Sequence, residues 1–121
     1  MENKSRQIFI VSDATGQTCE RVVRAAMAQF ESQDIDLRIW SYVRSPEAVE
    51  KVVREAQNQE GVIVYSLVCP EEREKMVSIT DSLGVVAIDI LGPILDRLND
   101  FLDAGPKNIP GLFQELITEE D

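Results

Sequence analysis

The turn formed by residues 12–18 carries the residue types best suited to chemistry in this chain, in the order SDATGQT. It lies between a short apolar run and an amphipathic stretch, so a helix is expected to begin within it. The first N–H groups of a helix lack intrahelical partners and carry about half a positive charge, which favours a bound phosphate. Gly16 permits close backbone approach, and the hydroxyls of Thr15 and Thr18 can donate to phosphate oxygens. We therefore expect an anion site at Ser12, Asp13, Thr15, Gly16 and Thr18.

The carboxylate of Asp13 opposes such binding. A second negative charge about 4 Å away costs a few kcal/mol at an effective dielectric constant of about 20, comparable to one or two charge-assisted hydrogen bonds. Binding is expected to be weak unless the carboxylate turns away, caps the loop or shares a divalent cation. An alternative stays open, in which Asp13 and Thr15 only cap the turn and Gly16 only relieves backbone strain. The spacing matches neither G-x-G-x-x-G nor G-x-x-x-x-G-K-[ST].

Three secondary candidates follow later apolar runs, where strands are expected to end. Arg44 can supply positive charge if its strand lies beside the first one, and Ser66 ends the third run. Asp89 can bind a metal or a ribose, or can simply begin the turn toward Pro93. The chain has no histidine and only two cysteines, which are far apart. The usual zinc and haem ligand sets are therefore missing, and we assign no metal site.

The elements that position these residues alternate regularly along the chain. Strands are expected at 7–12, 36–43, 62–68 and 85–90, and helices at 16–31, from Pro46 to Gly61, from Pro70 to Gly84 and from Gly92 onward. Four such βα units predict an α/β, Rossmann-like fold, with a doubly wound, mostly parallel sheet of about four strands and helices on both faces. Ligands of such sheets bind beyond the carboxyl ends of the strands, where all the candidate residues are expected to lie.

Apolar spacing predicts which side chains of these elements point inward. The first helix is expected to bury Val22, Val23, Ala26, Met27 and Phe30, the second Val49, Val52, Val53 and Ala56, and the last Ile94, Leu95, Leu98 and Leu102. Ser45 and Pro46 are typical of a helix start. Trp40 and Tyr42 share one face of the second strand, and we expect that face to be core under a helix rather than an interface patch.

Composition narrows the classes of partner. The chain has 121 residues, 44% of them hydrophobic and 28% charged, which is typical of one soluble globular domain. Twelve basic against 22 acidic residues give a formal net charge of −10. Such a surface repels polyanions, so binding to nucleic acid or to an anionic membrane is not expected. The sequence has neither a signal-type start nor an apolar run of about 20 residues, which predicts a cytoplasmic or organelle-interior protein.

Residues 12–18 resemble the T-x-T-G-x-T phosphate loop of flavodoxin-like FMN proteins, since Thr15, Gly16 and Thr18 match. Asp13 stands where a hydroxyl is expected, however, and the aromatic that stacks on a flavin after the third strand is missing. A response regulator is also excluded, because its third strand ends in an acceptor aspartate and this one ends in Ser66. We therefore expect no flavin.

A resemblance to one family runs along essentially the whole chain. Its most specific parts are S-D-x-T-G-x-T in residues 12–18 and IDILGP in residues 88–93, together with VYSLVCPEER and GPKNIPGL. These segments resemble the pyruvate, phosphate dikinase regulatory proteins, or kinase–pyrophosphorylases, which include the regulators of phosphoenolpyruvate synthetase. Cys19 stands where a small alanine is expected.

The resemblance implies a bifunctional enzyme. Family members use ADP to phosphorylate a threonine of the dikinase, and remove that phosphate by attack of inorganic phosphate, which releases pyrophosphate. They are much longer than this chain, and their phosphate-binding loop lies in a C-terminal domain. The resemblance thus implies an N-terminal α/β domain in residues 1–104 and an irregular, acidic segment in 105–121 that leads toward that domain. We assign no catalytic residue to this chain, and expect ADP or ATP and phosphate to bind mainly elsewhere.

Two hypotheses stay open at this point. In the first, the chain is the N-terminal, regulatory or substrate-recognition domain of an ADP-dependent serine/threonine protein kinase and pyrophosphorylase, with pyruvate, phosphate dikinase or phosphoenolpyruvate synthetase as its partner. In the second, it is a stand-alone Rossmann-like module that binds a small anion or nucleotide at the turn from Ser12 to Thr18. Either form can be a homodimer, which the sequence leaves open.

Overall fold

The computed structural model of the chain describes residues 5–31, 34–103 and 105–112. Strands and helices alternate along these residues. The strands are β1 (Arg6–Ser12), β2 (Ile35–Trp40), β3 (Val62–Ser66) and β4 (Ala87–Asp89), and the helices are α1 (Gln17–Met27), α2 (Pro46–Asn58), α3 (Pro70–Leu83) and α4 (Gly92–Leu102). The predicted succession of four βα units is therefore confirmed.

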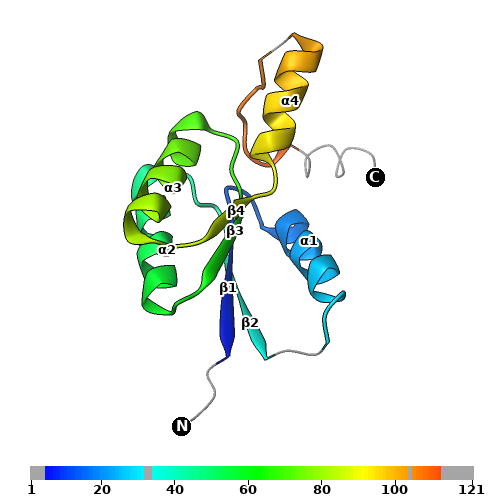
Figure 1. The fold of residues 1–121 in the computed structure, drawn as a ribbon. Helices are drawn as coiled ribbons and strands as arrows, with labels where there is room; N and C mark the ends of the chain where they lie inside the picture. Colours follow the sequence, from blue (N-terminus) through cyan, green and yellow to red (C-terminus); the bar gives the residue numbers. More distant parts are fainter. Residues whose placement is uncertain (1–4, 32–33, 104, 113–121) are drawn as a thin grey trace.

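All neighbouring strands of the sheet are parallel, in the order β2-β1-β3-β4. The connection through α1 leads from β1 to one edge strand, and the connection through α2 leads back across to β3 on the other side of β1. The chain therefore reverses its direction of winding between β1 and β3, and α1 lies on one face of the sheet with α2 and α3 on the other (Figure 1). This arrangement confirms the doubly wound, Rossmann-like fold and places its switch point after Ser12 and Ser66.

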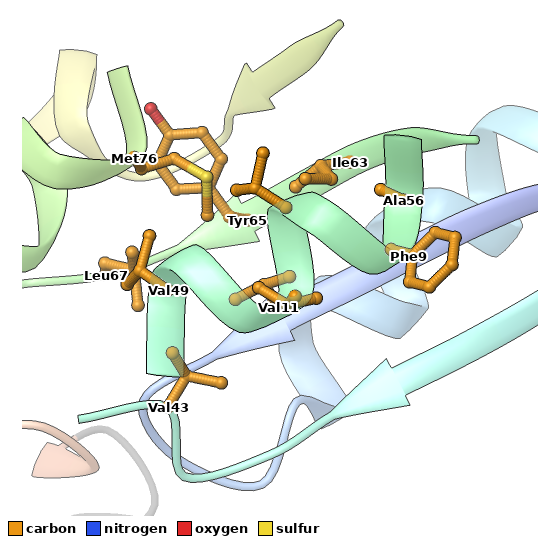
Figure 2. Packing of buried hydrophobic residues seen from close by; sticks show 11 residues of the cluster. Phe9, Val11, Val43, Val49, Ala56, Ile63, Tyr65, Leu67 and Met76 are labelled. Atoms are coloured by element: carbon orange, nitrogen blue, oxygen red, sulfur yellow. The ribbon is translucent and has the colours of Figure 1, made fainter. Parts of the chain in front are cut away.

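The larger core lies on the face covered by α2 and α3. Figure 2 shows this cluster, in which apolar side chains of β1 and β3 pack against α2 and Met76 of α3. The four side chains predicted to point inward from α2 are all fully buried: Val49, Val52, Val53 and Ala56. This helix begins as predicted, because the Ser45 hydroxyl accepts the Ala48 N–H at 3.1 Å and Pro46 occupies the first turn.

A smaller core lies under α1, around Ile10, Cys19, Val23 and Val64. The prediction that α1 extends over 16–31 was wrong at its C-terminal end. After Met27 the bonds Gln29 N–H to Ala26 O and Phe30 N–H to Met27 O tighten the chain into turns. Phe30 is consequently exposed. Val22 and Ala26 are exposed as well, so that of the five residues predicted to point inward Val23 is buried and Met27 is partly buried.

Three strands are shorter than predicted. The second ends at Trp40 rather than at residue 43, because Tyr42 adopts a positive φ of 56° and its N–H donates to Ala14 O at 2.8 Å. Trp40 is half-buried against the larger core, as expected, whereas Tyr42 is exposed. The third strand ends at Ser66 and the fourth spans only Ala87–Asp89.

The prediction that the apolar stripe of α4 points inward was wrong for three of its four residues, and only Leu95 is partly buried. Ile94, Leu98 and Leu102 are exposed, and α4 projects beyond the carboxyl ends of the strands instead of covering a face (Figure 1). The turn before it explains this position: Asp89 Oδ1 accepts the N–H groups of Leu91 at 3.0 Å and Gly92 at 2.7 Å. The helix therefore begins at the sheet edge itself. None of the helices in the described part of the chain is long and apolar enough to cross a membrane.

Candidate anion site at the carboxyl edge of the sheet

The turn between β1 and α1 is held by its own side chains. The Ser12 hydroxyl accepts the Ala14 N–H at 3.0 Å, and the Thr15 hydroxyl accepts the Gln17 N–H at 3.3 Å. Gly16 precedes α1 with φ of 92°, and a Cβ there would lie 3.1 Å from Cγ2 of Ile39. Only glycine fits this left-handed, crowded position without strain. The turn therefore includes the capping that the sequence left as an alternative, but side chains cap only part of the helix N-terminus.

Asp13 is directed away from the cavity beside this turn. It is only 5% exposed, and its Oδ2 accepts the Val68 N–H of the β3–α3 loop at 2.8 Å. Its backbone carbonyl accepts from Nε of Arg44 at 2.7 Å. Of the three arrangements that would relieve repulsion of an anion, the structure combines two, because the carboxylate is turned away from the cavity and caps a loop. Asp13 thus links the loops after β1, β2 and β3 rather than contributing to an anion cradle.

Burial raises the pKa of the Asp13 carboxyl, and the nearby, buried Glu72 raises this pKa further. The Val68 N–H, the N–H of Asp13 itself and the Arg44 guanidinium lower it by smaller amounts, because each stabilises the charged form. The net direction is upward. At acid pH a smaller fraction of the Asp13 carboxyl is therefore ionised than of an ordinary aspartate.

The loop after β2 fixes the same turn from its other side. The Ser41 hydroxyl donates to Thr15 O at 2.7 Å, and the N–H of Val43 donates to Ser12 O at 2.9 Å. Residues 12–15 are therefore bonded to two neighbouring loops before any ligand arrives. Such bonding pre-organises the backbone that leads into α1.

A cavity of about 710 Å³ lies next to this turn. One end of it is lined by the predicted site residues Ser12, Gly16, Thr18 and Ser66, which the structure brings together. Most of the remaining lining is apolar and comes from α4 and residues 105–112, with Lys107 supplying a cation. The cavity thus joins a polar end, at the N-terminus of α1, to a long apolar wall.

Three other predicted residues, Thr15, Arg44 and Asp89, lie outside this lining. The Arg44 guanidinium packs over the Tyr42 ring, 5.2 Å from the ring centroid. Its Nε donates to Asp13 O, so Arg44 stabilises the turn without lining the cavity. Asp89 caps α4, which is the simpler of the two roles considered for it. It also contributes to a second cavity of about 460 Å³ beside Arg73. Burial, and to a smaller extent the Asp89 carboxylate, raises the pKa of Tyr65 to about 12.

Two features of the cavity escaped the sequence prediction. Lys107 and part of the apolar wall belong to residues 105–112, which fold back toward the turn. A Cβ built on Gly111, for example, would lie 3.8 Å from the Cβ of Ala14. The Gly/Pro punctuation of this segment gave a signal for irregular backbone but not for its direction. The rest of the predicted segment 105–121, from residue 113 onward, lies outside the described residues. Among the described residues no cluster of His, Cys, Asp and Glu suits a metal ion.

Known proteins similar to this chain agree on one family. The family model described as Kinase/pyrophosphorylase matches residues 8–121. A Sorangium cellulosum protein named "Putative pyruvate, phosphate dikinase regulatory protein" is 36% identical over 117 residues, which cover 97% of this chain and 42% of that protein. A protein of the same name from Geobacter metallireducens is 34% identical over 119 residues, covering 98% of this chain and 44% of the relative.

The chain thus spans less than half the length of the curated relatives it matches. The match nevertheless includes the turn before α1, the β3–α3 loop and the wall of the cavity, because the family model extends over nearly the whole chain. The chain belongs to the kinase/pyrophosphorylase family.

Proposed function

We propose that this chain is the substrate-recognition part of a bifunctional enzyme that regulates pyruvate, phosphate dikinase or phosphoenolpyruvate synthetase. In the forward reaction ADP donates its β-phosphoryl group to a threonine hydroxyl of the target, leaving AMP. In the reverse reaction inorganic phosphate attacks the phosphothreonine phosphorus, which frees the hydroxyl and releases pyrophosphate. Support comes from family membership and from the names of the relatives.

We assign phosphate recognition, rather than phosphoryl transfer, to this chain. The observation that carries this assignment is the position of the α1 N-terminus, with Ser12 and Thr18, at one end of the cavity and at the switch point of the sheet. Helix N–H groups and a hydroxyl can bind phosphate oxygens there, and Asp13 is turned away from them. Lys107, which also lines the cavity, can add positive charge. ADP or inorganic phosphate fits the same donors, since each presents terminal phosphate oxygens.

Transfer chemistry needs more than this cradle. A phosphoryl group in transit is stabilised by a close lysine or arginine and by bound Mg²⁺. Lys107 is the lysine that the described part of the cavity supplies, and the described residues hold no acidic cluster suited to a metal. We therefore expect the chain alone, incubated with ADP, Mg²⁺ and the phosphohistidine form of the dikinase, to leave the target threonine unmodified. Phosphorylation of the target threonine would contradict this expectation.

The recognition role is tested by binding to the target itself. Immobilised dikinase is prepared with and without the regulatory phosphothreonine, and binding of this chain to each form is measured by biolayer interferometry. We expect tighter binding to the phosphorylated form, and loss of that preference in Gly16→Val, whose side chain is strained at a φ of 92° and crowded against Ile39, so that it displaces the turn that leads into α1. Gly84→Val serves as the control, because Gly84 also has a positive φ but lies away from the cavity. Equal affinity of the parent chain for both forms would overturn the role.

A further inference from the structure

The segment before and within β4 alternates between a buried and an open side. Val85 and Ala87 pack against the larger core, whereas Val86 is 61% exposed and Ile88 is 50% exposed. Ile88 pairs with Val64, whose side chain belongs to the core under α1. Paired residues of neighbouring strands point to the same face of a sheet, so Ile88 and, by alternation, Val86 lie on the α1 face.

The sequence of this segment is that of a strand covered on both faces. Parallel strands buried on both sides are apolar nearly throughout, and residues 85–90 are VVAIDI. On the opposite face α2 and α3 cover the sheet, but on this face α1 is the helix that contacts it, over β1 and β3 (Figure 1). In the described part of the chain the α1 face of β4 therefore lacks the cover that its sequence indicates.

The exposed apolar surface continues from β4 to both neighbouring helices. Ile90 extends the alternation of Val86 and Ile88, packs against the α1-side core, and lines the large cavity together with Val22 of α1 and Ile94 of α4. Val22 and Ile94 are also exposed. We call Val22, Val86, Ile88, Ile90 and Ile94 the apolar strip. It lies between α1 and α4 and is open to solvent on the side of β4.

We propose that the apolar strip is an interdomain face, covered in full-length kinase/pyrophosphorylases by an apolar segment from the part of the protein outside the region that this chain matches. More than half of each relative's length lies outside that region, so such a segment has a source in the same polypeptide. A second copy of this chain is a poorer occupant, because each copy carries a formal net charge of −10 and the two would repel each other. The face is distinct from the phosphate-binding end of the cavity and does not depend on the transfer activity proposed above.

Thiol labelling in a full-length relative tests this proposal. A single cysteine is placed in the Sorangium cellulosum protein at the position aligned with Ile88 or, as the control, at the position aligned with Val77. Val77 is 57% exposed, on α3 and therefore on the opposite face. The same pair, Ile88→Cys and Val77→Cys, is made in this chain with Cys69→Ser; Cys19 is fully buried and its thiol pKa is raised to about 12, so it stays unreactive.

In this chain both introduced thiols are expected to react with a maleimide at similar rates. In the full-length relative the thiol aligned with Ile88 is expected to react at least ~100-fold more slowly than the control, since reaction then requires local opening of the covered face. This protection is expected to be independent of protein concentration. Equal rates in the full-length protein would overturn the proposal, and protection that grows with concentration would assign the face to a second copy instead.

Discussion

The two faces of the sheet differ in how completely helices cover them. On one face α2 and α3 bury a continuous cluster from Phe9 to Met76, and its members on the strands have no solvent contact or nearly none. On the other face α1 covers β1 and part of β3, while Ile88 is half exposed and α4 projects past the sheet edge. The first face has the burial of a complete hydrophobic core, whereas the second leaves apolar side chains open to solvent, and it is on this second face that we propose the interdomain contact. The difference separates residues whose burial stabilises the fold from residues whose exposure leaves them available for contacts outside this chain.

The largest expected effect comes from a matched pair of isoleucines on adjacent strands and opposite faces. Ile63→Ala removes a fully buried side chain from the complete hydrophobic core and is expected to lower the free energy of unfolding by about 3–5 kcal/mol. Ile88→Ala, on the open face, is expected to lower it by less than about 1 kcal/mol. Urea denaturation of both variants measures the difference. If Ile63→Ala does not fold, the matched pair becomes Ile63→Val, expected to cost about 1 kcal/mol, and Ile88→Val, expected to cost less than about 0.5 kcal/mol. Similar losses at Ile63 and Ile88 would remove the distinction between the faces.

A second pair sharpens the comparison at the binding edge. Gly16→Ala is expected to cost about 2–3 kcal/mol, because φ is 92° and the new Cβ would lie 3.1 Å from Cγ2 of Ile39. Gly84→Ala is expected to cost only about 1 kcal/mol, since its φ of 70° is also positive but nothing lies within 4 Å of the new Cβ. Thermal or urea unfolding of the two variants separates crowding from backbone strain. Equal costs would mean that β2 does not confine the turn.

Asp13 gives a smaller effect with a defined pH dependence. Asp13→Ala leaves the Val68 N–H without its acceptor and is expected to cost about 1–2 kcal/mol. Because burial raises the Asp13 pKa above its ordinary value of 3.8, the native state binds the proton more readily than the unfolded state does. The contribution of Asp13 to the free energy of unfolding therefore falls as pH rises from 3.8 through the raised pKa, and is constant above it.

The variant Asp13→Asn isolates that dependence, since it keeps an acceptor oxygen for Val68 but does not titrate. The unfolding free energy of the parent chain minus that of Asp13→Asn is expected to decrease as pH rises through this range. Denaturant titrations at several pH values measure this difference. A difference that increases with pH would mean that Asp13 has a lowered pKa and acts as a charged partner of Arg44.

The sequence predicts the fold well where local and global preferences agree. The alternation of apolar runs with amphipathic stretches predicts the parallel sheet, and Ser45-Pro46 predicts the start of α2 with its four buried residues. The region from Ser12 to Thr18 is predicted at the carboxyl edge because every βα turn of such a sheet lies there. These features depend on periodicity and capping, which are properties of short segments.

Features that depend on neighbouring loops could not be predicted in the same way. The direction of the Asp13 carboxylate depends on the Val68 N–H, 55 residues further along the chain. The apolar stripe of α4 predicts burial, but the Asp89 turn decides where the helix begins and therefore what it can cover. Lys107 reaches the cavity only because residues 105–112 fold back. In each case the missing information is which segments are adjacent in space.

Titration of the isolated chain with inorganic phosphate, followed through backbone amide shifts, tests the assigned phosphate site most directly. One or two charge-assisted hydrogen bonds correspond to a dissociation constant in the range of about 1–10 mM. We predict saturable shifts of the Thr18 and Cys19 amides at the start of α1, none in Gly16→Val, and none at the start of α3, where Glu71 and Glu72 repel anions. Sodium chloride at matched ionic strength is the control. Unchanged Thr18 and Cys19 amides at tens of millimolar phosphate, or equal shifts with chloride, would contradict the phosphate site and leave the turn with a capping role alone.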